Sequence, residues 1–402
     1  MIKVAVLGYG TVGSGVVEVL QDNRELIAGR LGEDIEVKYI LDLRDFPGDK
    51  NESLVVHDVK TIMDDPEVDI VCETMGGVGA AYEFTKSALT AGKSVCTSNK
   101  ELVEKHGAEL LKLASENGCN YQFEASVGGG IPIIRVINTS LAPERIDSIK
   151  GILNGTTNYI LTKMADEGAD YASVLKQAQD LGYAERNPEA DVEGHDAGRK
   201  IAILASLMTG KDVAYDDIYI EGITAVEPVD FKFADRLGRR IKLIARADRN
   251  DDVAITAFVA PHMIPKDHPL GGVNDVFNAV LVTGNMLGDA MFYGKGAGKL
   301  ATASAVVSDV IDLGRAKLAG ISLPCVWSED KAVLRAHDEK KESFFVRTAS
   351  VDADKLASVI PGATKVADAD GQTGYVVDDI SEKELNGAIE RSGVCVRKIR
   401  LA

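Results

Sequence analysis

The sequence predicts a mixed α/β protein that begins with a doubly wound parallel sheet. Three observations predict this fold class. A short apolar strand at residues 2–7 ends directly in a glycine-rich loop, a helical pattern and a second strand follow, and strands then alternate with helices to about residue 135. Strands that alternate with helices build a parallel sheet covered on both faces. We therefore expect a Rossmann-type domain over residues 1–135.

The elements of this first domain follow one another regularly. Short apolar runs predict strands at residues 35–41, 69–73 and 94–97. Apolar residues at helical spacing predict helices at residues 12–30, 80–91 and 101–117. Each crossover is long enough for a β-α-β unit, which is the building block of a parallel sheet.

Beyond Pro132 the pattern changes to that of an α+β domain over residues 136–299. Strands are expected at residues 146–153, 254–259 and 279–284. Helices are expected at residues 171–181 and 194–208. An apolar helix at residues 302–313 follows the glycine-rich stretch 294–298, and we expect residues 300–318 to pack back on the first sheet.

A third unit is expected over residues 343–402, after the charged run 338–342, which we interpret as a linker. Its pattern is strand, helix, strand, strand, helix, strand, the ferredoxin-like order of small regulatory domains. The bounded elements are expected at residues 344–351, 355–360, 374–378, 382–392 and 394–399.

Composition limits the classes of function. The chain has 402 residues, 45% of them hydrophobic and 27% charged, which is typical of a folded protein with two or three domains. The net charge of −17 disfavours nucleic acid and anionic membranes as partners. No signal segment and no run near ~18 apolar residues is visible, so we expect a cytoplasmic protein. The five cysteines are widely spaced and are expected to be reduced thiols.

The glycine-rich loop Gly8-Tyr9-Gly10-Thr11-Val12-Gly13 lies between a strand and a helix. In that context the glycines permit a tight turn and the close approach of a pyrophosphate to the helix N-terminus. The loop predicts a nicotinamide dinucleotide site formed by Gly8, Gly10, Thr11, Val12 and Gly13.

The second strand ends in Asp42-Leu43-Arg44-Asp45, where acidic and basic side chains compete for the coenzyme ribose. A carboxylate favours the 2′-hydroxyl of NAD, and arginine favours the 2′-phosphate of NADP. We favour NADP, or dual use, because Arg44 is the only fixed cation here and each aspartate could turn outward to water. A solvated strand end without a coenzyme role is an equal alternative for Arg44 and Asp45.

The segment 178–200 is dense in charge and leads into an apolar helix, Ile201–Met208. Asp196 and Lys200 are four residues apart and therefore share one helical face. From spacing alone, a surface ion pair is the simpler interpretation.

The whole segment resembles the signature of homoserine dehydrogenases, A-x3-G-[aromatic]-[small]-x2-[D/N]-P-x2-D-[aliphatic]-x-G-x-D-x3-K, and it fits at every fixed position. The resemblance extends to about residue 320. Five further stretches resemble the family and occur in the same order along the chain: Gly8–Gly13, Thr97–Lys100, Phe123–Pro132, Asn154–Asn158 and Phe292–Gly298. The resemblance implies NAD(P)-dependent hydride transfer between aspartate semialdehyde and homoserine, in the aspartate pathway to threonine, methionine and isoleucine.

The resemblance also implies roles for single residues. Lys200 matches the proton-transfer lysine, and Lys100 matches a second lysine that faces substrate and coenzyme. Glu185 and Asp196 match the carboxylates that bind homoserine. Hydride transfer changes the charge on the substrate oxygen, and a lysine can both stabilise that charge and move the proton. The substrate carboxylate would be left for the backbone N–H groups of Asn154, Gly155 and Thr156.

Coenzyme and cation sites are implied in the same way. Further residues implied to line the coenzyme are Thr97, Lys100, Gly182 and Gly296. A monovalent cation site, usually sodium, is implied at Glu124 with the carbonyls of Val127, Gly129 and Ile131. The alternative for residues 124–131 is a plain turn with an exposed glutamate and no bound cation.

The C-terminal unit resembles a reduced or diverged ACT domain, because the junction 350–356 lacks the glycine of the family's turn. A structural or dimer-forming role is expected there at least as much as threonine feedback. No kinase segment precedes Gly8, so we expect a monofunctional enzyme, and family habit implies a homodimer or higher homo-oligomer.

Two other functions fit parts of the sequence. An aspartate semialdehyde dehydrogenase would need a nucleophilic cysteine, and Cys96 and Cys119 are the candidates in plausible regions. A coenzyme-bound sensor would not need two lysines and two acids in these contexts. His195 points about 100° away from Asp196 on a helix and is not expected to be catalytic. The histidines expected at the surface are His57, His106, His262 and His268.

Overall fold

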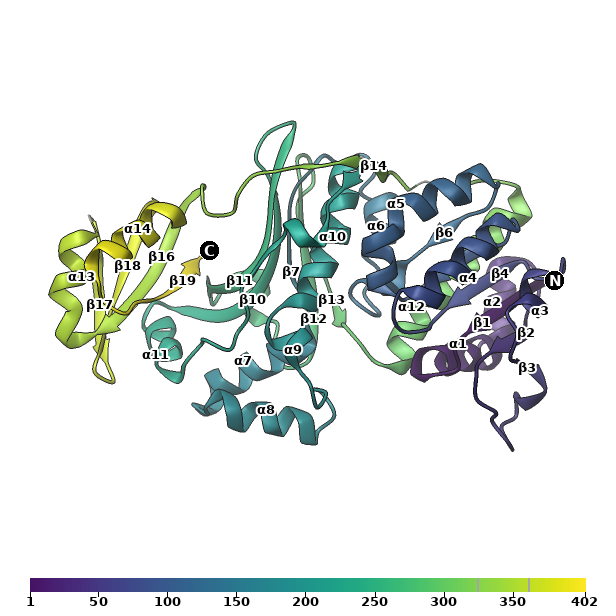
Figure 1. Cartoon of the computed structure of the whole chain (residues 1–402), viewed down its shortest axis with the longest axis horizontal. Coiled ribbons are helices and arrows are strands. Elements are labelled where there is room, and N and C mark those ends of the chain that lie inside the picture. The colour runs from purple at the N-terminus through teal and green to yellow at the C-terminus, as the bar shows by residue number, and fades with distance from the viewer. Residues whose placement is uncertain (324, 361) are drawn as a thin grey trace. The chain divides into compact units, whose positions relative to one another are not determined.

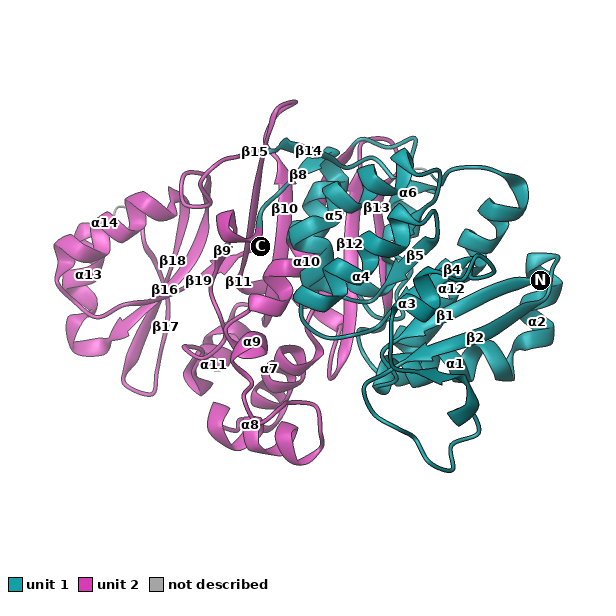
Figure 2. Cartoon of the chain, turned by 45° about the vertical axis from the view of Figure 1, so that its right-hand side comes forward, with its two compact units in different colours: residues 1–145, 202–214, 294–332 teal, residues 146–201, 215–293, 333–402 magenta. Residues whose placement is uncertain are grey.

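The computed structural model describes residues 1–323, 325–360 and 362–402. The chain forms two compact units, which Figure 2 colours separately. Unit 1 comprises residues 1–145, 202–214 and 294–332, and unit 2 comprises residues 146–201, 215–293 and 333–402. In the described part of the chain, no helix combines the length and the apolar character needed to cross a membrane.

Unit 1 is built on a sheet of six strands in the order β3-β2-β1-β4-β5-β6, and every neighbouring pair is parallel. Its strands are β1 (Ile2–Leu7), β2 (Ile35–Leu41), β3 (Val55–Val56), β4 (Ile70–Glu73), β5 (Ser94–Thr97) and β6 (Tyr121–Gln122). The strand order reverses direction between β1 and β4, which makes this pair the switch point of a doubly wound sheet. The predicted parallel sheet is confirmed.

Helices cover both faces of this sheet. The helices are α1 (Thr11–Asp22), α2 (Arg24–Leu31), α3 (Lys60–Met63), α4 (Gly79–Thr90), α5 (Lys100–Glu116), α6 (Ile134–Asn138) and α12 (Lys299–Ala319). Helix α12 packs on α1, where Gly15 leaves room for Ala303, and its apolar residues share one core with β1 and β2. On the opposite face, α4 and α5 pack on each other (Figure 2), α4 against β4 and β5, and α5 against β6.

One predicted helix is wrong in extent. The single helix expected over residues 12–30 breaks at Asn23, which separates α1 from α2. The backbone of Asn23 leaves the helical region, with φ −103° and ψ 17°, and its N–H closes the end of α1. Asn often occupies helix ends because its short polar side chain competes with the helix for backbone hydrogen bonds.

Unit 2 is built on an eleven-stranded mixed sheet whose main path is β13-β12-β7-β10-β11-β19-β16-β18-β17. Its strands are β7 (Ile146–Ile152), β9 (Tyr219–Ile220), β10 (Arg239–Arg249), β11 (Ala254–Pro265), β12 (Phe277–Gly284), β13 (Gly288–Lys295), β15 (Val333–Leu334), β16 (Lys341–Ala349), β17 (Thr364–Ala369), β18 (Gln372–Ser381) and β19 (Arg397–Leu401). Strands β9 and β15 pair with β11 outside that path. The charged strand β10 was not predicted, because basic residues at its ends mask the alternation typical of a strand.

The remaining elements are short connections and the helices of unit 2. Those helices are α7 (Gly155–Glu167), α8 (Tyr171–Asp180), α9 (Glu189–Val192), α11 (Pro228–Arg236), α13 (Ala353–Val359) and α14 (Glu382–Ser392). Helix α10 (His195–Thr209) belongs to unit 2 up to Ile201 and to unit 1 from Ala202. The strands β8 (Lys211–Asp212) and β14 (Ser328–Lys331) pair with each other. The 3-10 turns are η1 (Glu52–Leu54), η2 (Glu124–Ser126), η3 (Tyr215–Asp217), η4 (Pro269–Gly272) and η5 (Ser350–Asp352).

The C-terminal residues form the predicted β-α-β-β-α-β order, with strands in the spatial order β19-β16-β18-β17. Helices α13 and α14 lie together on one face of this small sheet (Figure 1) and bury Phe344, Leu356 and Leu385. The linker predicted at residues 338–342 is wrong at its end, because Lys341 already pairs with Ser381 in the sheet.

The small sheet continues the larger sheet of unit 2. Strand β19 pairs in parallel with β11, with Arg400 opposite His262. The expectation of a surface position for His262 is therefore wrong: the residue is 1% exposed, because β11 is a central strand that is buried along most of its length. Burial lowers the pKa of His262 well below its usual value, so the ring is neutral.

Candidate active site

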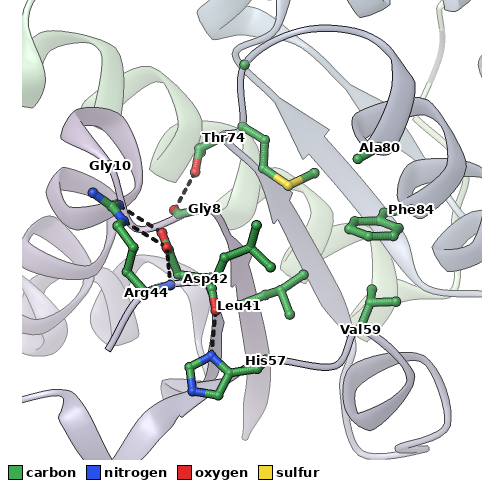
Figure 3. A pocket seen from close by; sticks show the side chains of 13 residues that line it. Gly8, Gly10, Leu41, Asp42, Arg44, His57, Val59, Thr74, Ala80 and Phe84 are labelled. Carbon is green, nitrogen blue, oxygen red and sulfur yellow. Dashed lines mark hydrogen bonds and ion pairs between the residues drawn. The ribbon is translucent and has the colours of Figure 1, made fainter. Parts of the chain in front are cut away.

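A cavity of about 530 Å³ lies at the carboxyl ends of β1, β2 and β4 in unit 1. Doubly wound sheets bind their ligands at this switch point. The cavity is drawn in Figure 3 and is lined by Gly8, Gly10, Leu41, Asp42, Leu43, Arg44, His57, Val59, Thr74, Met75, Gly76, Ala80 and Phe84.

The predicted glycine loop forms one wall of this cavity. Gly8 has φ +93°, a conformation that favours glycine. A Cβ on Gly13 would lie 1.8 Å from the Gly8 carbonyl oxygen, whereas a Cβ on Gly10 would meet no atom within 4 Å. Gly10 is also the N-cap of α1 and offers no side-chain cap to the first-turn N–H groups. The loop is thus tightly packed at Gly13 and open at Gly10, and a pyrophosphate could approach the N-terminus of α1 from that open side.

Asp42 and Arg44 lie together at the end of β2. The Asp42 carboxylate accepts the Tyr9 N–H at 2.8 Å and two hydrogen bonds from the Arg44 guanidinium, at 2.9 and 3.0 Å. These bonds, that of Arg44 above all, hold the pKa of Asp42 well below its usual value. The expectation that each aspartate could turn outward is wrong for Asp42, whose side chain is 10% exposed, while that of Arg44 is 62% exposed.

Sequence reasoning missed His57 and Thr74 in this cavity. His57 Nδ1 lies 2.7 Å from the Asp42 carbonyl oxygen and Nε2 lies 3.1 Å from the Asp45 carboxylate. The Thr74 hydroxyl donates to the carbonyl of Gly8 (Figure 3) and to that of Leu7. Thr74 directly follows the predicted third strand at the switch point, which was a usable signal. His57 follows the two-residue strand β3, which carries no local pattern.

Thr97 and Lys100 do not line this cavity. Thr97 is fully buried and its hydroxyl donates to Glu73, whose pKa burial raises to about 7. The Thr97 oxygen also accepts the N–H of Asn99, and Asn99 caps α5 by accepting from Leu102 at 3.1 Å. Lys100 is the first residue of α5, so the Thr97 network determines where that helix begins.

In unit 2, Lys200 and Asp196 form a buried ion pair. The Lys200 ammonium donates to the Asp196 carboxylate at 2.7 Å and to the Leu153 carbonyl at 2.7 Å. Their side chains are 10% and 7% exposed. The interpretation of this spacing as a surface pair is therefore wrong, because α10 buries this face. A buried pair with directed hydrogen bonds is costly to form and is typical of functional sites.

Asn154 connects this pair to a second acid. Its amide donates to Asp191 at 2.7 Å and to Asp196 at 2.9 Å, while its oxygen caps α7 at the N–H of Thr157. Burial, and next the charge of Asp196, raise the pKa of Asp191. Asp191 was missed as a site residue, although it is a fixed position of the signature quoted above.

The other predicted substrate and coenzyme residues of unit 2 lie around the loop between α8 and α9. Glu185 is exposed, and Gly182 is exposed with φ +75°. The Thr156 hydroxyl donates to the Tyr183 carbonyl at 2.7 Å, which ties the start of α7 to this loop. His195 is hydrogen-bonded to the Tyr215 hydroxyl at 2.8 Å.

Glu124 is buried rather than exposed, so the plain-turn alternative is wrong. Its carboxylate accepts the N–H groups of Ile134 at 2.9 Å and Arg135 at 2.6 Å, which caps α6. Its own N–H donates to Asp309 at 2.9 Å. Burial raises the pKa of Glu124.

The turn after Glu124 packs tightly against the segment around residue 296. Gly129 has φ +56°, and a Cβ there would lie 2.5 Å from the Gly296 carbonyl oxygen. Gly130 donates its N–H to the Lys295 carbonyl at 3.1 Å. Val127, Gly129 and Ile131 are buried residues, and the backbone hydrogen bonds of the described turns and loops include none to their carbonyls.

The two cysteines considered as nucleophiles are buried. Burial raises the pKa of Cys96 well above its usual value and that of Cys119 to about 11. A thiol must ionise to attack an aldehyde, so neither site supports thioester chemistry.

Comparison with known proteins places the chain in a family. The family model described as "Homoserine dehydrogenase, NAD binding domain" matches residues 8–124, and the model "Homoserine dehydrogenase" matches residues 132–311. The homoserine dehydrogenase of Synechocystis sp. is 50% identical over 320 residues, which are 78% of this chain and 73% of that protein.

Solved structures agree along the chain. The crystal structure of a homoserine dehydrogenase from Thiobacillus denitrificans has a TM-score of 0.89 and 35% identity, and the alignment covers 100% of this chain and 98% of that one. A hyperthermophilic archaeal homoserine dehydrogenase in complex with NADPH has a TM-score of 0.66 and 27% identity, covering 81% and 99%. Since sequence relatives, domain matches and structures agree, the chain belongs to the homoserine dehydrogenase family, the NAD(P)-dependent oxidoreductases that interconvert aspartate semialdehyde and homoserine in the aspartate pathway.

Proposed function

We propose that this homoserine dehydrogenase uses Lys200 to move the substrate hydroxyl proton and favours NADP over NAD. The observation that carries the proposal is the buried Asp196–Lys200 pair. An ammonium group held by a carboxylate and a carbonyl, each at 2.7 Å, has a defined direction. Such a group can donate a proton to the aldehyde oxygen and can take it back from the alcohol.

A bound nicotinamide coenzyme supplies the hydride acceptor for homoserine, or the donor for the aldehyde. The protein's part is to hold it: the N-terminus of α1 and the open face of Gly10 suit the pyrophosphate. The apolar side chains of Leu41, Val59 and Phe84 converge on the other side of the cavity (Figure 3) and suit a flat adenine ring.

The preference for NADP rests on two basic side chains beside the cavity, Arg44 and His57. The Arg44 guanidinium is largely exposed and is oriented by its two bonds to Asp42. The pKa of His57 is raised, first by its bond to the Asp42 carbonyl and then by the charge of Asp45. A 2′-phosphate offers oxygens to both groups. Asp42 can still accept a ribose hydroxyl, which supports secondary use of NAD.

Homoserine is a zwitterion, and the cluster in unit 2 has groups for both charges. Asp196 and Glu185 would bind the ammonium group, with Asp191 as a third acid beside Asn154. Because the Asn154 amide is already committed to Asp191 and Asp196, the N–H groups of Gly155 and Thr156 at the start of α7 suit the carboxylate. Lys100, at the start of α5, is proposed as the second lysine of the reaction.

A sodium ion is proposed at the turn after Glu124. Its support is a set of three carbonyls on buried residues, those of Val127, Gly129 and Ile131, which accept no backbone hydrogen bond in the described turns and loops. Buried carbonyls without partners are costly, and a monovalent cation satisfies them. The Glu124 carboxylate is already engaged by α6, so a structural role is proposed for the ion.

We also propose that the C-terminal unit is a diverged ACT domain and that the enzyme is a homodimer. The β-α-β-β-α-β order supports the first statement. The second rests on family habit alone, and light scattering during size-exclusion chromatography measures the oligomeric mass directly.

Steady-state kinetics with both coenzymes test the proposed function. Homoserine oxidation should proceed without phosphate, and kcat/KM should be higher with NADP. In Arg44→Ala the ratio of the two kcat/KM values should fall about tenfold, because only NADP loses a charge-assisted contact. Arg24→Ala is the matched control, since Arg24 makes the same two-pronged bond to Asp34 on the surface. An unchanged ratio in Arg44→Ala removes Arg44 from the site, and turnover only with phosphate and aldehyde supports the rival dehydrogenase.

A further inference from the structure

We propose that Arg400, on the last strand of the chain, is a positioning residue for the substrate cluster of unit 2. The proposal rests on the roles proposed above for Asp196 and Lys200. Arg400 lies about 200 residues beyond these two in sequence. It acts on them through the segment Tyr219–Ile223, and every residue of this argument belongs to unit 2.

Arg400 makes a buried contact between the C-terminal residues 343–402 and the rest of unit 2. Its residue exposure is 3%, and its guanidinium donates to the Glu221 carboxylate at 2.9 Å and also to Glu382, the first residue of α14. The same guanidinium lies 5.5 Å from the ring centre of Tyr219 and 5.2 Å from that of Phe258. A planar cation held by two acids and two aromatic rings has a single orientation.

The segment that Arg400 holds is packed tightly against the end of α9 and the start of α10. The Ile223 N–H donates to the Val192 carbonyl at 2.8 Å. A Cβ on Gly222 would lie 2.4 Å from the same carbonyl oxygen. On the helix itself, a Cβ on Gly198 would lie 2.5 Å from the Ile220 side chain. These contacts require the segment and the helix to move together.

The start of α10 determines where the substrate acid lies. Gly194 turns the chain into the helix with φ +85°, and its Cα faces the Ile220 side chain, which a Cβ would approach to 3.0 Å. Asp196 follows two residues later, in the first turn, and its carboxylate holds Lys200. Displacements below an ångström at such a site are costly for binding. The Arg400–Glu221 contact therefore makes the C-terminal unit part of the substrate site's support.

The chain offers a matched control in the same small sheet. Arg347, on β16, is also 3% exposed and also bridges two acids, Asp230 at 2.6 Å and Glu227 at 2.8 Å. Those acids belong to the start of α11 and not to the segment beside α10. Replacing either arginine by lysine keeps the charge and loses the planar two-pronged contact, so the two variants differ in what the arginine holds.

The test compares kinetic constants and thermal stability of full-length variants. Arg400→Lys and Glu221→Gln should each raise the KM for homoserine about tenfold and leave the KM for the coenzyme unchanged. The double variant should be no worse than the more impaired single variant, because both remove one contact. Arg347→Lys should lower the Tm without changing the KM for homoserine.

Each outcome decides the matter. An unchanged homoserine KM in both Arg400→Lys and Glu221→Gln, with a raised KM in Asp196→Asn, overturns the positioning role alone. An unchanged KM in Asp196→Asn overturns the proposed substrate site instead. An equal rise in Arg347→Lys also overturns the proposal, since it would show general loosening of the small sheet. If Arg400→Lys does not fold, Glu221→Gln decides, because the Glu221 side chain is 30% exposed and tolerates replacement.

Discussion

The proposed coenzyme cavity of unit 1 and the proposed substrate cluster of unit 2 are built in opposite ways. The cavity is shaped by backbone: a glycine at φ +93°, a second glycine with no room for a Cβ, and an uncapped helix N-terminus. The cluster is made of side chains: Lys200, Asp196, Asn154 and Asp191 are joined by hydrogen bonds of 2.7 to 2.9 Å.

This difference explains which of the two sites could be predicted from consecutive residues of the sequence. A backbone site leaves its mark in consecutive residues, because glycine is required wherever the turn or the close approach demands it. The side-chain site joins residues that lie far apart in the sequence: Asn154 and Lys200 are 46 positions apart. Whether Asp196 and Lys200 form a surface ion pair or a buried one depends on the burial of that helix face. Local spacing alone predicted a surface pair.

The largest effect is expected at the centre of the cluster. Lys200→Met should lower kcat by about 10³-fold, because it removes the group proposed to move the substrate proton. Coenzyme binding, measured by fluorescence titration, should change little. Lys176→Met is the control, since Lys176 pairs with Asp180 at the same four-residue spacing but 73% exposed. Equal loss of turnover in both variants would contradict the assignment.

The backbone site should be broken by a single methyl group. Gly13→Ala places a Cβ 1.8 Å from the Gly8 carbonyl oxygen, so the loop must shift. The coenzyme Kd should rise on the order of a hundredfold. Gly29→Ala adds the same atom on α2, where it meets nothing within 4 Å, and should leave the Kd unchanged. A coenzyme Kd that resists Gly13→Ala would show that this loop does not carry the pyrophosphate.

A smaller effect is expected when the cluster loses one charge but keeps its shape. Asp196→Asn removes a buried charge from the ammonium site, and such a loss costs roughly 1.5–3 kcal/mol. The KM for homoserine should rise by about ten- to a hundredfold, with a smaller change for the coenzyme. Asp180→Asn, in the exposed pair, should have no kinetic effect. If Asp196→Asn raises the KM for homoserine and Asp180→Asn does not, the effect belongs to the buried side-chain cluster.

The smallest effect is a pH dependence of coenzyme choice. The bond to the Asp42 carbonyl raises the pKa of His57, and Asp42, Asp45 and Arg44 are the charged groups beside it. His57 is cationic below that pKa, so the preference for NADP should decline as pH rises through it. The ratio of kcat/KM for NADP to that for NAD, measured from pH 6 to 9, should fall about threefold in the native enzyme. In His57→Gln the ratio should follow only the ionisation of the 2′-phosphate, and identical profiles would exclude His57.

The sequence by itself predicted most of the elements, the glycine-rich loop and the family, but not strand β10 or the break between α1 and α2. Alternating strands and helices in residues 1–135 lead to the parallel sheet, and the β-α-β-β-α-β order of the last residues is present in the chain. These features depend on interactions within a few residues, such as periodicity, caps and turn conformations, which are written in consecutive positions. The quoted signature led to Lys200 and Asp196 only through resemblance.

Only the tertiary structure decided what each polar group does. Asp42 is held inward by the Tyr9 N–H, Glu124 caps α6, and His262 is buried because β19 adds to β11. Strand β19 pairs with β11, more than 130 residues earlier in the chain, and this pairing brings Arg400 to Glu221. Such pairing is selected by the total burial and hydrogen bonding of the folded chain, and no local pattern encodes it.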